Sequence, residues 1–238
     1  MNLIQKFTCN PQQLHTMIQR LTLHNTPPII DYIKEKHDIN NFIEIQNKII
    51  QYPKHSFAIK LSSLGIHESE MDCSIKLEKL IYEAKQSNSR LLIDAEEHNI
   101  QHKIDDMTDY YMKQYNKDIP LIFKTYQMYK LDSQSKLFID LQKSRDYKIG
   151  VKLVRGAYLH QDKDKNILCN SENETHQQYD QGIKDFVSQH KKGDILLCAT
   201  HNHRSIHLAR YYIDKHNLNN IEFAQLLGMS DNITNILE

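Results

Sequence analysis

The chain has 238 residues, a length that suits one large domain and that a single α/β barrel would use almost completely. Its 30 basic and 30 acidic side chains balance, so no net field attracts nucleic acid or an anionic membrane surface. The four cysteines are scattered, and neither a disulfide framework nor a zinc ribbon is expected. No long apolar run occurs, which predicts a single domain over residues 1–238 without a membrane span.

Seven short apolar runs recur along the chain at intervals that fit one strand, one helix and two loops. They cover residues 28–32, 57–64, 90–96, 120–127, 149–157, 194–200 and 223–228. Between them, residues 71–86 and 203–216 carry apolar side chains at helical spacing. This alternation predicts a parallel sheet, and polar residues at the carboxyl ends of the runs favour a (β/α)8 barrel of the TIM type. No Gly-x-Gly-x-x-Gly follows a run, which weakens a dinucleotide-binding alternative.

No eighth apolar run can be assigned in the sequence. Residues 230–238 suffice for part of one helix only. We therefore predict a barrel that lacks its last β/α unit, in which the first and the seventh strand each present an unpaired edge. Such a barrel is expected to be poorly stable by itself unless a partner chain completes it.

Polar side chains follow most of the predicted strands, where a barrel would gather them at one mouth. The most informative run, Lys152 to Tyr158, begins as a buried strand and ends in a cation, a glycine that lets backbone approach a ligand, and an aromatic ring. Purely structural roles remain open, since Lys60 and Asp94 can pair with each other and Tyr158 can be a core aromatic. The full set of candidates is Lys60, Asp94, Glu96, Gln127, Lys152, Arg155, Tyr158, Thr200, His201, Asn202 and Gln225.

A metal-dependent barrel hydrolase is an alternative, because histidines lie near a possible carboxylate pair. The imidazoles of this alternative are His201, His203 and His207, and the carboxylates are Asp94 and Glu96. His98 and His102 lie four residues apart, but 14 histidines make such a spacing common by chance. Two charged segments, residues 162–165 and 191–192, are predicted to be solvent-facing loops.

Seven motifs taken in order resemble the eukaryotic branch of the proline dehydrogenase family. The resemblance covers roughly residues 28–230, and the agreement in order is more specific than any single motif. The motifs are Ile30-Asp-Tyr32, Ala58-Ile-Lys-Leu-Ser-Ser-Leu64, Ile93-Asp-Ala-Glu-Glu97, Thr125-Tyr-Gln127, Lys152 to Tyr158, Ala199-Thr-His-Asn202 and Gln225-Leu-Leu-Gly-Met229.

The resemblance implies an FAD enzyme of proline breakdown. Hydride would pass from C5 of L-proline to the flavin, giving 1-pyrroline-5-carboxylate, and the electrons would continue to a quinone. The substrate would be surrounded by Lys60, Asp94, Tyr158 and Leu227, with Tyr158 against the pyrrolidine ring. The FAD would be lined by Gln127, Lys152, Ala157, Thr200, His201 and Asn202, with Lys152 beside the isoalloxazine.

Members of that family continue into an eighth strand and a helix whose paired arginines and glutamate clamp the substrate. The sequence ends at Glu238 without such a segment. A non-catalytic remnant and a barrel completed by a partner chain therefore stay open beside the active enzyme. The family implies a mitochondrial protein, but the N-terminus resembles no transit peptide, so a cytoplasmic location is the alternative.

Overall fold

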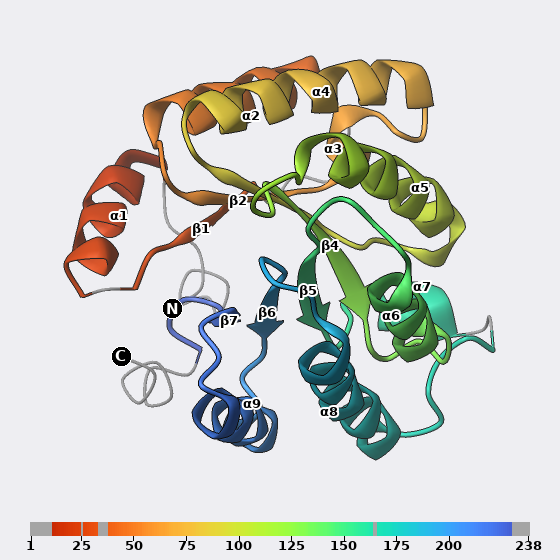
Figure 1. Ribbon diagram of the computed structural model, residues 1–238. Helices are drawn as coiled ribbons and strands as arrows, with labels where there is room; N and C mark the ends of the chain where they lie inside the picture. The colour runs from red at the N-terminus through yellow and green to blue at the C-terminus, as the bar shows by residue number, and fades with distance from the viewer. Residues whose placement is uncertain (1–10, 25, 33–37, 164–165, 230–238) are drawn as a thin grey trace.

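The computed structural model describes residues 11–24, 26–32, 38–163 and 166–229. Its centre is a parallel sheet in which each strand pairs with the next one along the chain (Figure 1). This order is the barrel topology that the alternation of strands and helices predicts. The strands are β1 (Ile29–Asp31), β2 (Ser56–Ile59), β3 (Arg90–Ile93), β4 (Ile122–Gln127), β5 (Gly150–Val154), β6 (Ile195–Ala199) and β7 (Ile221–Ala224).

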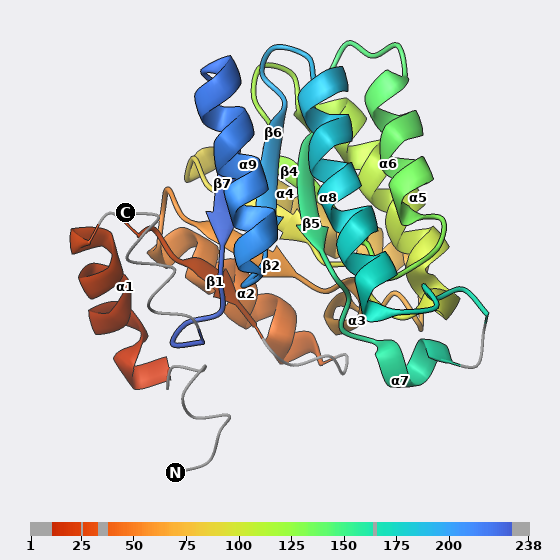
Figure 2. The same cartoon turned by 90° about the horizontal axis from the view of Figure 1, so that it is seen from below.

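Helices cover the outer face of this sheet, and two short ones, α3 and α7, lie at the carboxyl ends of the strands (Figure 2). In the described part of the chain, none of the helices combines the length and the apolar content that a membrane crossing needs. The helices are α1 (Leu14–Leu23), α2 (Ile39–Gln51), α3 (Leu61–Leu64), α4 (Glu70–Gln86), α5 (His98–Tyr115), α6 (Ser133–Gln142), α7 (Leu159–Asp162), α8 (Glu172–Gln189) and α9 (His203–His216), and a 3-10 turn (Pro11–Gln13) precedes α1.

Side-chain caps fix where several helices begin. The hydroxyl oxygen of Ser69 accepts from the backbone N–H of Asp72 at the start of α4, and Ser171 accepts from Glu174 at the start of α8. Asn202 caps α9 in the same manner, by accepting from the backbone N–H of Ser205. Each cap satisfies a backbone donor that has no partner within the helix.

An ion pair between two strands that are not neighbours stabilises the curl of the sheet at the amino ends of the strands. Arg90 on β3 donates two hydrogen bonds to Glu222 on β7, at 2.8 and 2.9 Å. Its Nε also donates to the hydroxyl of Ser56 at 3.2 Å, and the guanidinium lies 5.3 Å from the centroid of the Phe123 ring. Three strands separate β3 from β7 in the sheet order, so this contact requires the sheet to close around its inner face.

The strand register divides the apolar side chains between two cores. Further along the strands than Arg90, the side chains of Leu92, Phe123 and Leu197 fill the inside of the barrel. The larger core lies between the outer face of the sheet and the helices, as in other α/β barrels. Polar side chains that share the inner face with the small cluster, further along each strand, therefore point into the mouth of the barrel.

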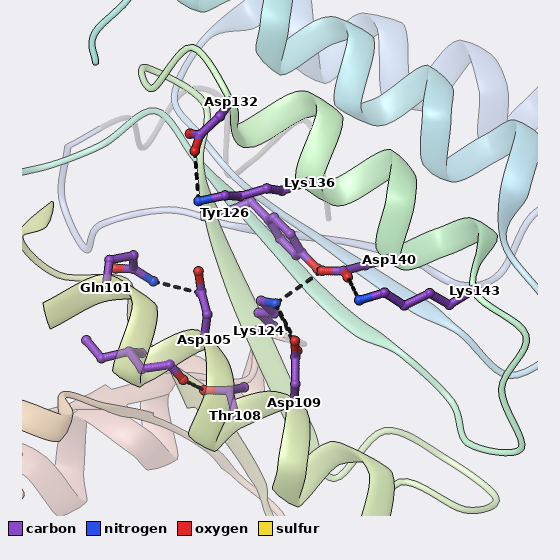
Figure 3. A network of polar contacts seen from close by, with 11 residues as sticks. Gln101, Asp105, Thr108, Asp109, Lys124, Tyr126, Asp132, Lys136, Asp140 and Lys143 are labelled. Carbon is purple, nitrogen blue, oxygen red and sulfur yellow. Dashed lines mark hydrogen bonds and ion pairs between the residues drawn. The ribbon is translucent and has the colours of Figure 1, made fainter. Parts of the chain in front are cut away.

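A buried ionic network ties β4 to the helices on its outer side (Figure 3). Lys124 Nζ lies 2.8 Å from Asp109 on α5 and 3.1 Å from Asp140 on α6. The hydroxyl of Tyr126 also donates to Asp140, at 2.8 Å. Burial alone would lower the pKa of Lys124, but the surrounding carboxylates, Asp109 first, raise it overall. Lys124 is therefore a charged residue of the outer layer and does not belong to the barrel mouth.

The predicted elements agree with the structure except in their limits. The helix expected over residues 203–216 is α9, and the helix expected over 71–86 is α4 with one further residue. The single strand expected over 57–64 is wrong, because β2 ends at Ile59 and residues 61–64 form α3. The part of a helix expected over 230–238 lies outside the described residues.

Candidate functional site

The register of β2 to β5 brings four of the predicted site residues to one face of the sheet. Ala58 pairs with Leu92, so Lys60 and Asp94, two residues further along, point to the same side. Thr125 pairs with Lys152, and Gln127 with Val154, which places Gln127 and Lys152 on the inner face as well. These four side chains lie above the apolar cluster at the carboxyl ends of the strands, where barrel enzymes form their active sites.

The ion pair of Asp94 links β3 to β5 across β4. Its Oδ1 accepts from Lys152 Nζ at 2.5 Å, and the two side chains are 15% and 12% exposed. The sequence left a pairing of Asp94 with Lys60 open, and the structure shows an ion pair between Asp94 and Lys152. A nearly buried charge pair of this kind keeps a cation and an anion ready at the barrel mouth without a large net charge.

Gln127 is buried and has an amide oxygen that needs a partner. The side chain is 3% exposed, and its Oε1 accepts no hydrogen bond from any described residue. Buried amide oxygens are nearly always satisfied, so this oxygen is an acceptor on the inner face that a bound group could use.

Glu96 lies beyond the carboxyl end of β3 and is buried. Its Oε1 accepts from the backbone N–H of Ser62, in the first turn of α3, at 3.0 Å. Burial raises the pKa of Glu96, while the Ser62 contacts and the charge of Lys60 act to lower it. Glu96 thus holds α3, the helix that follows Lys60, against the end of β3.

A cleft of about 290 Å³ opens between the ends of β5 and β6 and the first turn of α8. It is lined by Arg155, Glu172, His176, Ala199, Thr200, His201 and Asn202. Three of the residues expected to hold a cofactor, Thr200, His201 and Asn202, therefore meet in one depression. Concave surfaces with several convergent polar groups are typical of ligand sites.

Arg155 organises the wall of this cleft. Its Nε donates to His176 Nδ1 at 3.0 Å, and its terminal nitrogens donate to the hydroxyls of Thr200 at 2.5 Å and Ser205 at 2.9 Å. The guanidinium also lies 4.3 Å from the centroid of the Tyr179 ring. Burial lowers the pKa of Arg155, but an arginine stays charged at any ordinary pH. These contacts give Arg155 a role in fixing β5, β6 and α8 relative to one another.

His201 and Asn202 have defined hydrogen-bonding states. His201 Nε2 accepts from the backbone N–H of Leu226 at 3.0 Å, which leaves Nδ1 as the ring donor, and burial lowers the pKa of the imidazole. Asn202 uses its side-chain oxygen to cap α9.

A metal ion at His201 would compete with the backbone N–H of Leu226 for Nε2. Among the described residues, no group of three or more histidine, cysteine, aspartate or glutamate side chains is placed to hold a metal ion.

The segment after β5 carries the remaining predicted residues. Tyr158 is 9% exposed and precedes α7, Ala157 is exposed, and Leu227 is half-buried beyond β7. Gly156 has a φ of +134°, and a Cβ there would lie 2.0 Å from the Tyr129 ring. The close approach that this glycine allows is therefore to an aromatic ring of the protein itself.

Two residues of this region were missed or misread from the sequence. Tyr129 was not considered, and Asp162 was expected in a solvent-facing loop, which is wrong, since Asp162 is 0% exposed at the end of α7. The Tyr129 hydroxyl donates to Asp162 Oδ2 at 2.9 Å. No local signal marks the burial of Asp162, because its partners Tyr129 and His98 lie 33 and 64 residues away in the chain.

Comparison with known proteins identifies the family. The sequence pattern described as proline dehydrogenase matches residues 14–238. Proline dehydrogenase 1, mitochondrial, of Dictyostelium discoideum is 32% identical over 175 residues, which are 66% of this chain and 30% of that protein. Hydroxyproline dehydrogenase of Xenopus laevis is 31% identical over 178 residues, 67% of this chain and 38% of that protein. The chain thus spans about a third of the length of these relatives.

Solved structures confirm the barrel. The structure of proline utilization A from Corynebacterium freiburgense matches with a TM-score of 0.83 over 96% of this chain and 27% of that chain. Proline utilization A from Bdellovibrio bacteriovorus matches with a TM-score of 0.80 over 94% of this chain and 28% of that chain. The identities of 15% and 17% make this a likeness of fold, and it confirms the predicted TIM-type architecture.

Proposed function

This chain belongs to the proline dehydrogenase family, and we propose that it binds FAD and oxidises L-proline to 1-pyrroline-5-carboxylate. One observation carries the proposal. The inner face at the strand ends gathers Lys60, Asp94, Gln127 and Lys152, and the buried oxygen of Gln127 there has no described partner. A charged, partly unsatisfied barrel mouth is suited to a polar ligand that brings its own hydrogen-bond donors.

The residues present fit a flavin. An N–H group of the ring system can satisfy Gln127 Oε1, and the ammonium of Lys152 lies on the same face. The cleft lined by Thr200, His201 and Asn202 offers room for the rest of the cofactor, and His201 presents its free Nδ1 as a donor. Ala157, small and exposed, leaves the approach between these two regions open. The flavin, when bound, supplies the redox chemistry by accepting a hydride equivalent.

The substrate would lie over the Lys152–Asp94 pair. The oxidation removes a hydride from C5 and a proton from the ring nitrogen, and a C5=N double bond forms. A zwitterion matches a site that holds both a cation and an anion, so Lys60 and Asp94 would orient its two charged ends. Tyr158 would cover the pyrrolidine ring and Leu227 would add apolar contact, which excludes water from the reacting carbon.

Two further parts of the proposal rest on the relatives. We propose a mitochondrial location, since the relative from Dictyostelium discoideum is named as mitochondrial, and a quinone as the final electron acceptor, which the family resemblance of the sequence motifs implies. The relative from Xenopus laevis is named as a hydroxyproline dehydrogenase, so hydroxyproline is the competing substrate to compare. The two substrates differ by one ring hydroxyl, which Tyr158 and Leu227 would have to accommodate.

The test uses the full chain. After incubation with FAD and gel filtration, the absorbance spectrum reports bound flavin, and L-proline or hydroxyproline is then added without oxygen. Loss of the flavin absorbance band on adding L-proline is the expected result, and transfer to a soluble quinone analogue should restore it. Bound flavin that neither substrate bleaches would support the non-catalytic alternative. Absence of flavin binding at high micromolar protein would overturn the proposal.

A further inference from the structure

The segment between β5 and α8, which carries Tyr158, is attached at both ends to the residues that follow β4. The backbone N–H of Tyr129 donates to the carbonyl of Arg155 at 2.8 Å, and its carbonyl accepts from the N–H of Cys169 at 2.8 Å. Leu131 adds a bond to the carbonyl of Ile167. Tyr129 alone thus holds both the start and the end of this segment, at Arg155 and at Cys169.

The side chain of Tyr129 contacts the same segment, at Gly156 and at Asp162. Its ring lies so close to Gly156 that a Cβ at that position would clash at 2.0 Å. Its hydroxyl donates to Asp162 at 2.9 Å, and the backbone of Tyr158 hydrogen-bonds the same phenol. The pKa of Tyr129 is raised, first by burial and then by Asp162, so the phenol stays protonated and remains a donor.

Asp162 is the second anchor and is fully buried. Besides the Tyr129 hydroxyl, its carboxylate accepts from the backbone N–H of His98, at the start of α5, at 3.2 Å. Lys130 Nζ lies 3.4 Å from the same carboxylate, and it donates no hydrogen bond to any other described residue. The backbone N–H of Asp162 donates to the carbonyl of Tyr158 at 3.0 Å, which closes the turn of α7.

We propose that Tyr129 and Asp162 are positioning residues that hold the ring of Tyr158 in place over the substrate. The inference rests on the proposed function, since it assumes that Tyr158 covers the substrate ring. Neither residue touches the substrate in this arrangement. Both act through Tyr158, because Tyr129 fixes the chain before it and Asp162 fixes the turn after it. A binding surface that is held in one place loses less conformational entropy when it closes on a small ligand.

The outer side of β4 offers a matched control. Tyr126 is also buried, and its hydroxyl donates to Asp140 at 2.8 Å, but it faces the helix layer (Figure 3). Tyr126→Phe and Tyr129→Phe therefore remove the same group from the same kind of bond, one distant from the barrel mouth and the other beneath Tyr158. Asp162→Asn serves as a second variant of the positioning pair, because it keeps the size of the side chain.

Two measurements separate the inference from the proposed function. Hydrogen exchange of residues 156–163 needs no ligand, and we expect it to accelerate by about tenfold in Tyr129→Phe but not in Tyr126→Phe. Binding of tetrahydrofuran-2-carboxylate, a proline analogue that cannot form the C=N bond, is followed by the spectrum of the bound flavin. Its affinity should fall about tenfold in Tyr129→Phe and in Asp162→Asn, and stay unchanged in Tyr126→Phe.

A double variant decides whether the effect passes through Tyr158. In a Tyr158→Ala background, Tyr129→Phe should no longer change the affinity for the analogue. If hydrogen exchange of residues 156–163 is unchanged in Tyr129→Phe, the inference is overturned, whatever the affinity of that variant for the analogue. Faster exchange with unchanged affinity would also overturn it, by showing that the segment is held for another reason. If the parent protein binds flavin but not the analogue, the proposed substrate fails, and the assignment of Tyr158 fails with it.

Discussion

Lys152 Nζ and Asp94 Oδ1 lie 2.5 Å apart although β4 separates the strands that carry them. Both side chains point inward from the carboxyl ends of the sheet, where neither can be fully hydrated. The pair therefore acts as a bridge over β4, and beside it lies the unsatisfied oxygen of Gln127. Two charges and one open acceptor in this small region give the barrel mouth its capacity to bind a polar ligand.

A double-mutant cycle tests the coupling within this pair. Lys152→Met and Asp94→Asn should each lower the free energy of unfolding of the ligand-free protein by about 2–4 kcal/mol, because each leaves a nearly buried partner unpaired. The double variant should lose clearly less than the sum of the two. Urea unfolding followed by circular dichroism gives the three values. Additive losses would mean that the two side chains do not stabilise each other in solution.

Gln127 allows stability and ligand binding to be separated. Gln127→Met removes a buried oxygen without a described partner, so the ligand-free protein should lose little stability, about 1 kcal/mol or less. Flavin affinity should nevertheless fall by about 1–2 kcal/mol, which fluorescence titration measures. A weakened fold with unchanged flavin affinity would contradict the assignment of this oxygen to the cofactor.

Asn116 is the control for Gln127. It is also buried, but its amide nitrogen donates to the carbonyls of Ile122 and Lys148, and its oxygen accepts from the N–H groups of Leu121 and Ile122. Asn116→Leu should therefore cost about 2–4 kcal/mol of stability, since it strands several buried backbone groups.

The sequence predicted where the site residues lie in the barrel better than it predicted which side chains pair with each other. A strand end such as Asp94 was predicted because its apolar run stops where polar residues begin, a pattern that each strand shows alone. The partner of Asp94 depends on register and on the reach of a lysine across β4, neither of which is local. The burial of Asp162 was missed for the same reason. Its carboxylate is satisfied by the N–H of His98 and the hydroxyl of Tyr129, far away in the chain.

Glu96 and Asp140 should give opposite pH dependences of stability. Burial raises the pKa of Glu96, so the stability it contributes is complete below its ordinary pKa of 4.5 and is lost as the pH rises through its raised value. Glu96→Gln can still accept from Ser62. It should therefore match the parent protein near pH 4 and be more stable than the parent at pH 7.

Asp140 is the control of opposite sign. Burial would raise its pKa, but Lys124 and the hydrogen bonds of Lys143 and Tyr126 lower it overall. Its stabilising effect is present above its ordinary pKa of 3.8 and is lost as the pH falls through the lowered value. Asp140→Asn should thus be less stable than the parent at pH 7, with a difference that shrinks in acid. Unfolding by urea at several pH values reports both trends, and parallel curves for the two variants would refute the assignment.

Two glycines at positive φ separate backbone strain from steric contact. Gly156 has a φ of +134° and faces the Tyr129 ring at 2.0 Å from an added Cβ, whereas Gly193 has a φ of +93° and would meet the flexible Lys148 side chain at 3.1 Å. Gly193→Ala should cost about 1–2 kcal/mol, mainly from strain, since its added Cβ meets only the Lys148 side chain and, at 3.3 Å, the backbone oxygen of Asp118. Gly156→Ala must also displace a ring that is packed under the Tyr158 segment, so its cost should reach about 3 kcal/mol or more. The free energy of unfolding measures both, and hydrogen exchange of residues 156–163 should rise only in Gly156→Ala. Equal losses from the two substitutions would show that Tyr129 moves aside freely and does not support this segment.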